Sequence, residues 1–103
     1  MDKGWLEVAR VDELPSGERL FFEVDGQPIV LLNIGGIFFA IGDTCTHDNG
    51  PLGDGEVIGT TIACPRHGAR FDLLTGKVLS PPAAEDVPSY PVKVEGQRVF
   101  ISI

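Results

Sequence analysis

All cysteine and histidine residues of the chain fall in two short segments. The first contains Cys45 and His47, and the second, ACPRHGARF at 63–71, contains Cys64 and His67. Sixteen residues separate the two pairs. Two thiolates and two imidazoles are donors that transition metals prefer in proteins. The spacing therefore predicts a metal centre held by two loops, each of which supplies one sulfur ligand and one nitrogen ligand.

Two kinds of metal centre are compatible with these four residues. Structural zinc commonly uses two cysteines and two histidines, but like ligands are usually grouped, the cysteines first and the histidines later. A [2Fe–2S] cluster with mixed ligation would take the cysteines on one iron and the histidines on the other. Mixed loops suit a centre with two irons, because each loop then contacts both metals. The four residues by themselves leave both centres open.

The elements that hold these loops are predicted to be antiparallel β-strands, which makes the fold all-β with sandwich-like or barrel-like sheets. Apolar and alternating runs predict strands at 6–9, 19–24, 27–33, 37–41, 90–95 and 98–103. Turns are expected at Asp25-Gly26, Gly35-Gly36 and Gly96, and the strands from 19 to 41 should form a meander. No helix is expected, since prolines at 81, 82 and 88 flank the best candidate at 83–86.

A turn-rich segment between these strands contains both Cys and His pairs. It is predicted to be a small cluster-binding subdomain of about residues 42–80, inserted into one β domain that spans 1–103. A chain of 103 residues suffices for one domain and can bury a real core.

The four residues and their surroundings resemble the motif of Rieske iron–sulfur proteins. Further matches are Gly50-Pro51-Leu52 after the first pair, Pro65 within the second, and Gly68 and Phe71 after it. The C-terminal run at 90–96 is similar to the end of Rieske ferredoxins that serve oxygenases. The resemblance covers nearly the whole chain and implies the Rieske fold with one [2Fe–2S] cluster. It also implies that Cys45 and Cys64 ligate an inner iron, and His47 and His67 an outer iron.

The residues next to the ligands are interpreted as shaping the loops. Pro51 and Pro65 would fix the loop backbone, Gly50 and Gly68 would permit close approach and unusual dihedral angles, and Leu52 and Phe71 would form apolar cover. Arg66 and Arg70 either pair with a partner's carboxylates or are solvated. The acidic residues near the loops are interpreted as a solvated surface: Asp43, Asp48, Asp54, Glu56 and Asp72.

Two differences from high-potential Rieske subunits predict a low reduction potential. Those subunits carry an extra, disulfide-bonded cysteine in each loop, whereas this chain has Arg66 at the second-loop position and no first-loop cysteine beyond Cys45. They also place a serine and a tyrosine, which donate to the cluster, where this chain has Ala69 and Phe71. Donors to sulfur stabilise the reduced cluster, so the expected potential is at the family's low end, about −150 mV or a little below.

The resemblance implies an electron-transfer protein rather than an enzyme. Its partners would be a flavin- and NAD(P)H-dependent reductase and a terminal oxygenase, of the ring-hydroxylating or a related type. No catalytic residues are expected, because both histidines are ligands and none is left for a Ser–His pair or a second iron site. Two alternatives stay open: the small subunit of a nitrite-reductase-type enzyme, and an iron–sulfur assembly or redox accessory protein.

The charge balance limits the partners further. Eight Lys and Arg face 15 Asp and Glu, a net charge of −7, which argues against nucleic acid and against an anionic membrane surface. The apolar run at 28–42 is too short for a membrane helix and is interrupted by Asn33. With no secretory signal and only two cysteines, a monomeric cytoplasmic protein with reduced thiols is expected.

Overall fold

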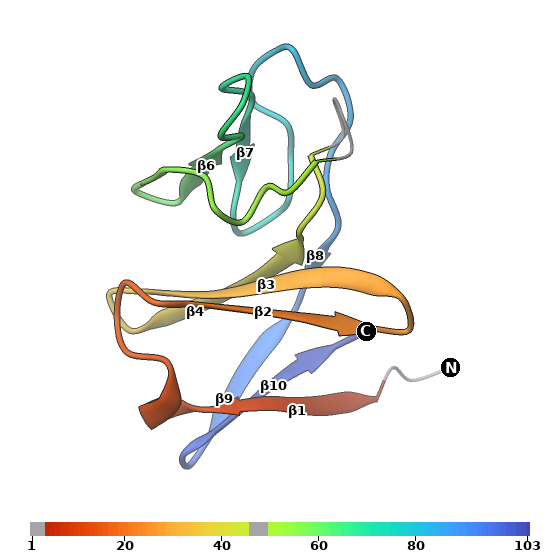
Figure 1. Cartoon of the computed structure of the whole chain (residues 1–103). Helices are drawn as coiled ribbons and strands as arrows, with labels where there is room; N and C mark the ends of the chain where they lie inside the picture. The colour runs from red at the N-terminus through yellow and green to blue at the C-terminus, as the bar shows by residue number, and fades with distance from the viewer. Residues whose placement is uncertain (1–3, 46–49) are drawn as a thin grey trace.

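The described part of the chain forms ten β-strands and one turn of 3₁₀ helix, so the all-β prediction is confirmed (Figure 1). The computed structural model describes residues 4–45 and 50–103. The elements in chain order are β1 (Trp5–Arg10), η1 (Val11–Glu13), β2 (Arg19–Val24), β3 (Gln27–Ile34), β4 (Ile37–Gly42), β5 (Val57–Ile58), β6 (Thr61–Ala63), β7 (Arg70–Asp72), β8 (Ser89–Tyr90), β9 (Val92–Glu95) and β10 (Arg98–Ser102).

The strands form three antiparallel sheets. Their orders are β1-β10-β9, β2-β3-β4-β8 and β5-β6-β7. The predicted meander is confirmed as β2-β3-β4, in which Phe22 lies opposite Ile29 and Leu31 opposite Ala40. Asp25 and Gly26 both have positive φ angles, 52° and 78°, as a two-residue hairpin turn between twisted strands requires.

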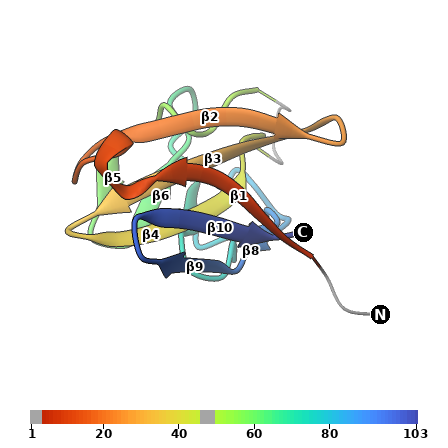
Figure 2. The same ribbon diagram turned by 90° about the horizontal axis from the view of Figure 1, so that it is seen from below.

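The sheet β2-β3-β4-β8 is the middle layer of the molecule. Ile29 and Leu31 of β3 share an apolar cluster with Val99 and Ile101 of β10. Val30 and Leu32 of β3 join a second cluster that contains residues of β6 and β7. Figure 1 shows β1-β10-β9 on one side of the meander and the β6–β7 hairpin on the other, and in Figure 2, seen from below, β1-β10-β9 faces the viewer. Because both faces of β3 are buried, its sequence from Ile29 to Leu32 is apolar at every position.

The strand predicted at 90–95 is divided at Pro91, which corrects that prediction. Tyr90 of β8 pairs with Ala40 of β4, whereas Val92 of β9 pairs with Ile101 of β10. Proline has no N–H to donate to a ladder, and the carbonyl of Pro91 accepts a hydrogen bond from the Ser102 N–H at 3.0 Å. The chain therefore passes from the middle sheet to the outer sheet at this proline.

Two other local features were not expected from the sequence. The turn η1 is a single 3₁₀ turn, and the Glu13 carboxylate accepts a hydrogen bond from the Arg10 N–H at 3.0 Å. The loop-based segment after β4 contains the small sheet β5-β6-β7. Within the described ranges, no helix has the length and apolar character needed to cross a membrane.

Candidate metal centre

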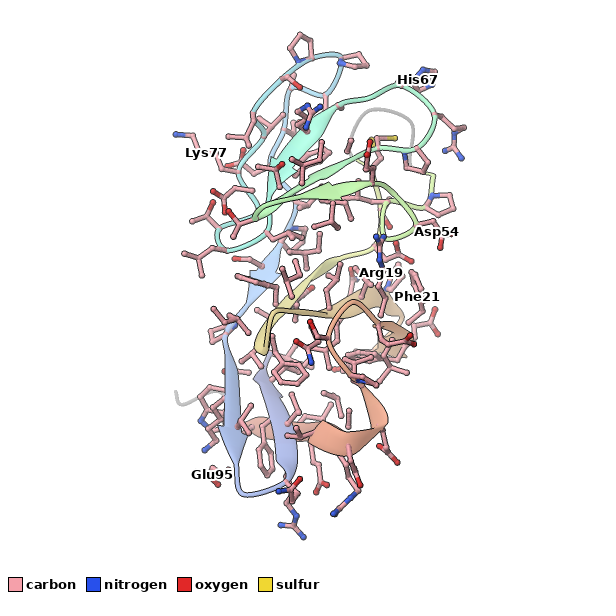
Figure 3. All side chains as sticks on the ribbon, turned by 90° about the vertical axis from the view of Figure 1, so that its left-hand side faces the viewer. Arg19, Phe21, Asp54, His67, Lys77 and Glu95 are labelled. Carbon is pink, nitrogen blue, oxygen red and sulfur yellow. The ribbon has the colours of Figure 1, made fainter. Side chains whose placement is uncertain are left out.

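The described ligand candidates lie on two loops next to the small sheet β5-β6-β7. The first loop follows β4, and the second connects β6 to β7, where Ala63 pairs with Arg70. Figure 3 shows His67 at this end of the molecule and Glu95 at the opposite end. The middle sheet lies between these ends, so the β1-β10-β9 sheet is remote from the second loop.

The two loops are closed by the same kind of hydrogen bond. The Cys45 N–H donates to the Gly50 carbonyl at 2.8 Å, and the Cys64 N–H donates to the Ala69 carbonyl at 2.7 Å. Each bond therefore joins a cysteine to the residue five positions later. In the second loop the Gly68 N–H also donates to the Cys64 carbonyl at 2.9 Å, and Gly68 has a φ of 77°, which favours glycine.

The two kinds of donor differ in burial. Cys45 and Cys64 are 0% and 2% exposed and belong to one apolar cluster, whereas His67 is exposed. Burying two thiolates in an apolar interior costs free energy unless a cation neutralises their charge. Iron bound to both sulfurs would supply that charge, so the donor set fits an iron–sulfur cluster with sulfur ligands inside and a nitrogen ligand at the surface.

The structure describes three of the four predicted ligands, because His47 lies outside the described residues. In residues 4–45 and 50–103, no three or more His, Cys, Asp and Glu side chains form a group that could hold a metal ion. The cysteines share the apolar cluster, and His67 lies at the surface of the second loop. The four-residue ligand set therefore stays a prediction.

The predicted neighbours of the ligands fall into an exposed set and a buried set. Pro51, Pro65, Arg66 and Gly68 are exposed. Leu52, Ala69 and Phe71 are fully buried in the same cluster as the two cysteines. Gly50 lies against Arg66 of the other loop, since a Cβ atom on Gly50 would collide with the Arg66 guanidinium. The buried set lines the apolar side of the loops, and the exposed set faces solvent.

Sequence reasoning missed two side chains that hold the first loop. The half-buried Asp43 accepts hydrogen bonds from the N–H groups of Leu52 at 3.1 Å and Gly53 at 2.5 Å, so its interpretation as a solvated acid was wrong. Arg19, at the start of β2, donates to the carbonyls of Gly53 and Gly55, the latter at 2.6 Å. These contacts join residues 34 and 36 positions apart, and no local pattern indicates them.

Asp72 also differs from its interpretation as a solvated acid. Its carboxylate accepts hydrogen bonds from the N–H groups of Leu74 at 2.7 Å and Thr75 at 3.2 Å. An aspartate that bonds to the backbone two and three residues later is a common turn-forming arrangement, and the sequence from Asp72 to Gly76 could have indicated it. Asp54 and Glu56 are exposed, and Asp48 lies outside the described residues.

These observations place the chain among small antiparallel β proteins with two loops that each carry a buried cysteine, the second of which also carries an exposed histidine. Residues 4–91 match the family model of the Rieske [2Fe-2S] domain. The chain belongs to this family, and the resemblance found from the sequence is confirmed. Family membership supports a [2Fe–2S] cluster as the cofactor.

The chain is similar along its whole length to ferredoxin components. It is 37% identical over 103 residues to the ferredoxin component of naphthalene 1,2-dioxygenase/salicylate 5-hydroxylase systems from Ralstonia sp., covering 100% of this chain and 99% of that protein. The ferredoxin of carbazole 1,9a-dioxygenase from Nocardioides aromaticivorans superposes with a TM-score of 0.87 at 31% identity, over 94% of this chain and 95% of that one. A complex of reduced oxygenase and oxidised ferredoxin in carbazole 1,9a-dioxygenase gives a TM-score of 0.86 at 30% identity, with coverages of 95% and 92%.

Proposed function

We propose that this chain is a one-electron carrier that receives electrons from a flavin- and NAD(P)H-dependent reductase and delivers them to a terminal oxygenase. The observation that carries the proposal is the full-length similarity to ferredoxin components of dioxygenase systems. The solved complex of an oxygenase with a similar ferredoxin supports the choice of acceptor. The acceptor is proposed to be of the ring-hydroxylating type, and the site of action to be the cytoplasm.

Four residues would hold the cluster in this proposal: Cys45 and Cys64 by sulfur, His47 and His67 by nitrogen. When bound, the cluster supplies a centre that takes up and releases single electrons. The chain's own residues would keep water from the sulfur side, because Leu52, Ala69 and Phe71 are fully buried beside both cysteines. The exposed imidazole of His67 would place a ligand where a partner protein can approach.

The acidic charge of the chain supports transient docking. A carrier must release each partner after transfer, and weak complexes of this kind have small interfaces and depend on ionic strength. The small subunit of a nitrite-reductase-type enzyme and an assembly accessory would both instead remain in stable complexes. The similarity to ferredoxin components favours the carrier over these two alternatives.

The proposal is tested by reconstitution. The purified chain is combined with NADH, a flavin-dependent ferredoxin reductase, the oxygenase component of a naphthalene 1,2-dioxygenase system, and naphthalene. Product formation should require the chain and should saturate as its concentration rises. The Cys64→Ala variant, which lacks a predicted ligand, should support none. Product formed equally fast without the chain, or no product with a cluster-containing chain and several such reductases and oxygenases, would contradict the carrier function.

A further inference from the structure

Two charged side chains, Asp43 and Arg19, hold the segment that returns from the first loop to β5, and we call this pair the clamp. The Asp43 carboxylate accepts hydrogen bonds from the N–H groups of Leu52 and Gly53, and the Arg19 guanidinium donates to the carbonyls of Gly53 and Gly55. Both polar groups of the Gly53 backbone are therefore held by charged side chains. Figure 3 shows Arg19 at the junction between the sheets and the small subdomain, close to Asp54.

The clamped segment fits tightly between its neighbours. A Cβ atom on Gly53 would lie 2.6 Å from the ring of Phe21 and 2.8 Å from the Asp43 carboxylate. A Cβ atom on Gly55 would collide with the carbonyl oxygen of Ala63 in β6. Both glycines are buried. The backbone at Gly53 and Gly55 is therefore closely packed against Phe21 of β2 and Ala63 of β6, and the clamp bonds to it there.

The clamp acts on only one of the two ligand loops. Asp43 precedes Cys45 by two residues, and the clamped Leu52 and Gly53 follow Gly50, whose carbonyl accepts the Cys45 N–H. The first loop is thus anchored at both ends to the middle layer. The second loop is instead closed within the β6–β7 hairpin by the bonds between Cys64, Gly68 and Ala69. The anchors of the first loop therefore act on its position relative to the second, together with the contact of Arg66 with Gly50 and the bond from the Ala63 N–H to the Glu56 carbonyl.

We infer that Arg19 and Asp43 are positioning residues that hold the first ligand loop in register with the second and so determine how long the cluster stays bound. The inference rests on the proposed function of the two loops as a cluster site. Hydrogen bonds with a charged partner are stronger than neutral ones, and backbone groups left without a partner favour opening of the segment. Loss of the clamp should therefore free the first loop while the β6–β7 hairpin stays closed.

The test combines hydrogen exchange with the rate of cluster loss in the full chain. Asp43→Ala and Arg19→Met each remove part of the clamp. Asp43→Asn keeps an oxygen acceptor, so its exchange and cluster loss should be closer to the wild type than those of Asp43→Ala. Arg98→Met is the matched control, because Arg98 is an exposed arginine of the outer sheet, 3.7 Å from Glu7. Amide exchange is followed by mass spectrometry in peptides that cover 43–58 and 61–73. Cluster loss is followed by bleaching of the visible absorption under an iron chelator.

The expected result is local. In Asp43→Ala and Arg19→Met, exchange in 43–58 should rise at least about tenfold while exchange in 61–73 changes less than about twofold. Cluster loss should be at least about fivefold faster in both variants and unchanged in Arg98→Met. Equal increases in the two peptides, or unchanged cluster loss despite faster exchange in 43–58, would overturn the inference. A wild-type chain that never shows iron–sulfur absorption would instead contradict the proposed function, and the exchange measurement would still decide whether the clamp exists.

Discussion

The guanidinium of Arg66 lies against Gly50, so the loop between β6 and β7 contacts the loop that follows β4 through an arginine that lies on a glycine. High-potential Rieske subunits have a cysteine at the position that corresponds to Arg66, and that cysteine forms a disulfide between the two loops. Here a non-covalent contact joins the loops instead. Such a contact requires glycine at position 50, because any Cβ atom there would collide with the guanidinium.

Gly50→Ala should therefore act by displacing Arg66. The guanidinium is the end of a flexible side chain and can move away, so we expect the free energy of unfolding to fall by less than about 1 kcal/mol. Arg66→Ala should have a similar effect, and the double variant should be no worse than either single variant, because both remove one contact. Urea unfolding measures the free energy of unfolding of the wild type, the two single variants and the double variant. Gly4→Ala is the matched control, since a Cβ atom on Gly4 meets nothing within 4 Å. Additive losses in the double variant would show that Gly50 and Arg66 act independently.

The absence of hydroxyl groups at two buried positions predicts the reduction potential. Ala69 and Phe71 are both fully buried in the apolar side-chain cluster that also contains Cys45 and Cys64. The midpoint potential should be at the family's low end, about −150 mV or a little below, and a value above about +100 mV would contradict this. Ala69→Ser should raise the potential by roughly 60 mV, since a hydrogen bond to a charged group is worth about 1.5 kcal/mol. A redox titration measures both values, with the exposed Ala84→Ser as the control that should not change the potential.

The single tyrosine predicts a loss of stability in alkali. Burial raises the pKa of Tyr90 above its usual value of 10.0. As the pH rises above that value, the unfolded chain loses the phenol proton before the folded chain does, so the free energy of unfolding falls. Urea unfolding at pH 8 and pH 11 should show a larger decrease for the wild type than for Tyr90→Phe. Because Tyr90 is the only tyrosine, tyrosinate absorbance reports its pKa directly, and a value at or below 10.0 would refute this explanation.

The net charge predicts how partners are attracted. At −7, the chain should be reduced faster by a reductase with a basic docking patch at low ionic strength than at high ionic strength. Stopped-flow reduction between about 20 mM and 500 mM salt covers the range in which screening becomes nearly complete. Glu56→Gln, which neutralises an exposed acid near the first loop, should lower the rate and flatten the profile. A rate independent of salt would remove charge steering from the account.

Strands that appear in the sequence as long apolar runs between turn residues could be predicted from the sequence alone. The meander β2-β3-β4 followed from apolar runs separated by Asp25-Gly26 and Gly35-Gly36, and the structure confirms it. The strands β5, β6 and β7 have only two or three residues each, too few to show an alternating pattern. The division at Pro91 depends on which sheet accepts each half of the predicted strand, and that is decided by tertiary pairing.

The candidate site shows the same division between local and long-range information. The spacing of cysteines and histidines predicted that these two loops form the metal site, because candidate ligands near each other in sequence are visible as a motif. The contrast between buried Cys64 and exposed His67 depends on the apolar cluster that β3, β4, β6 and β7 build together. The contact of Arg19 with Gly53 joins residues 34 positions apart, and only the folded chain brings them together.

The electron-paramagnetic-resonance spectrum of the freshly purified chain after reduction with dithionite decides whether the two loops hold a [2Fe–2S] cluster with histidine ligands. We predict a signal that is absent before reduction, integrates to about one spin per chain, and shows nitrogen couplings from two imidazole ligands. Those couplings should disappear in part in His47→Ala and in His67→Ala. A colourless chain that gives no signal and contains one zinc ion, or a reduced cluster without nitrogen coupling, would contradict the account.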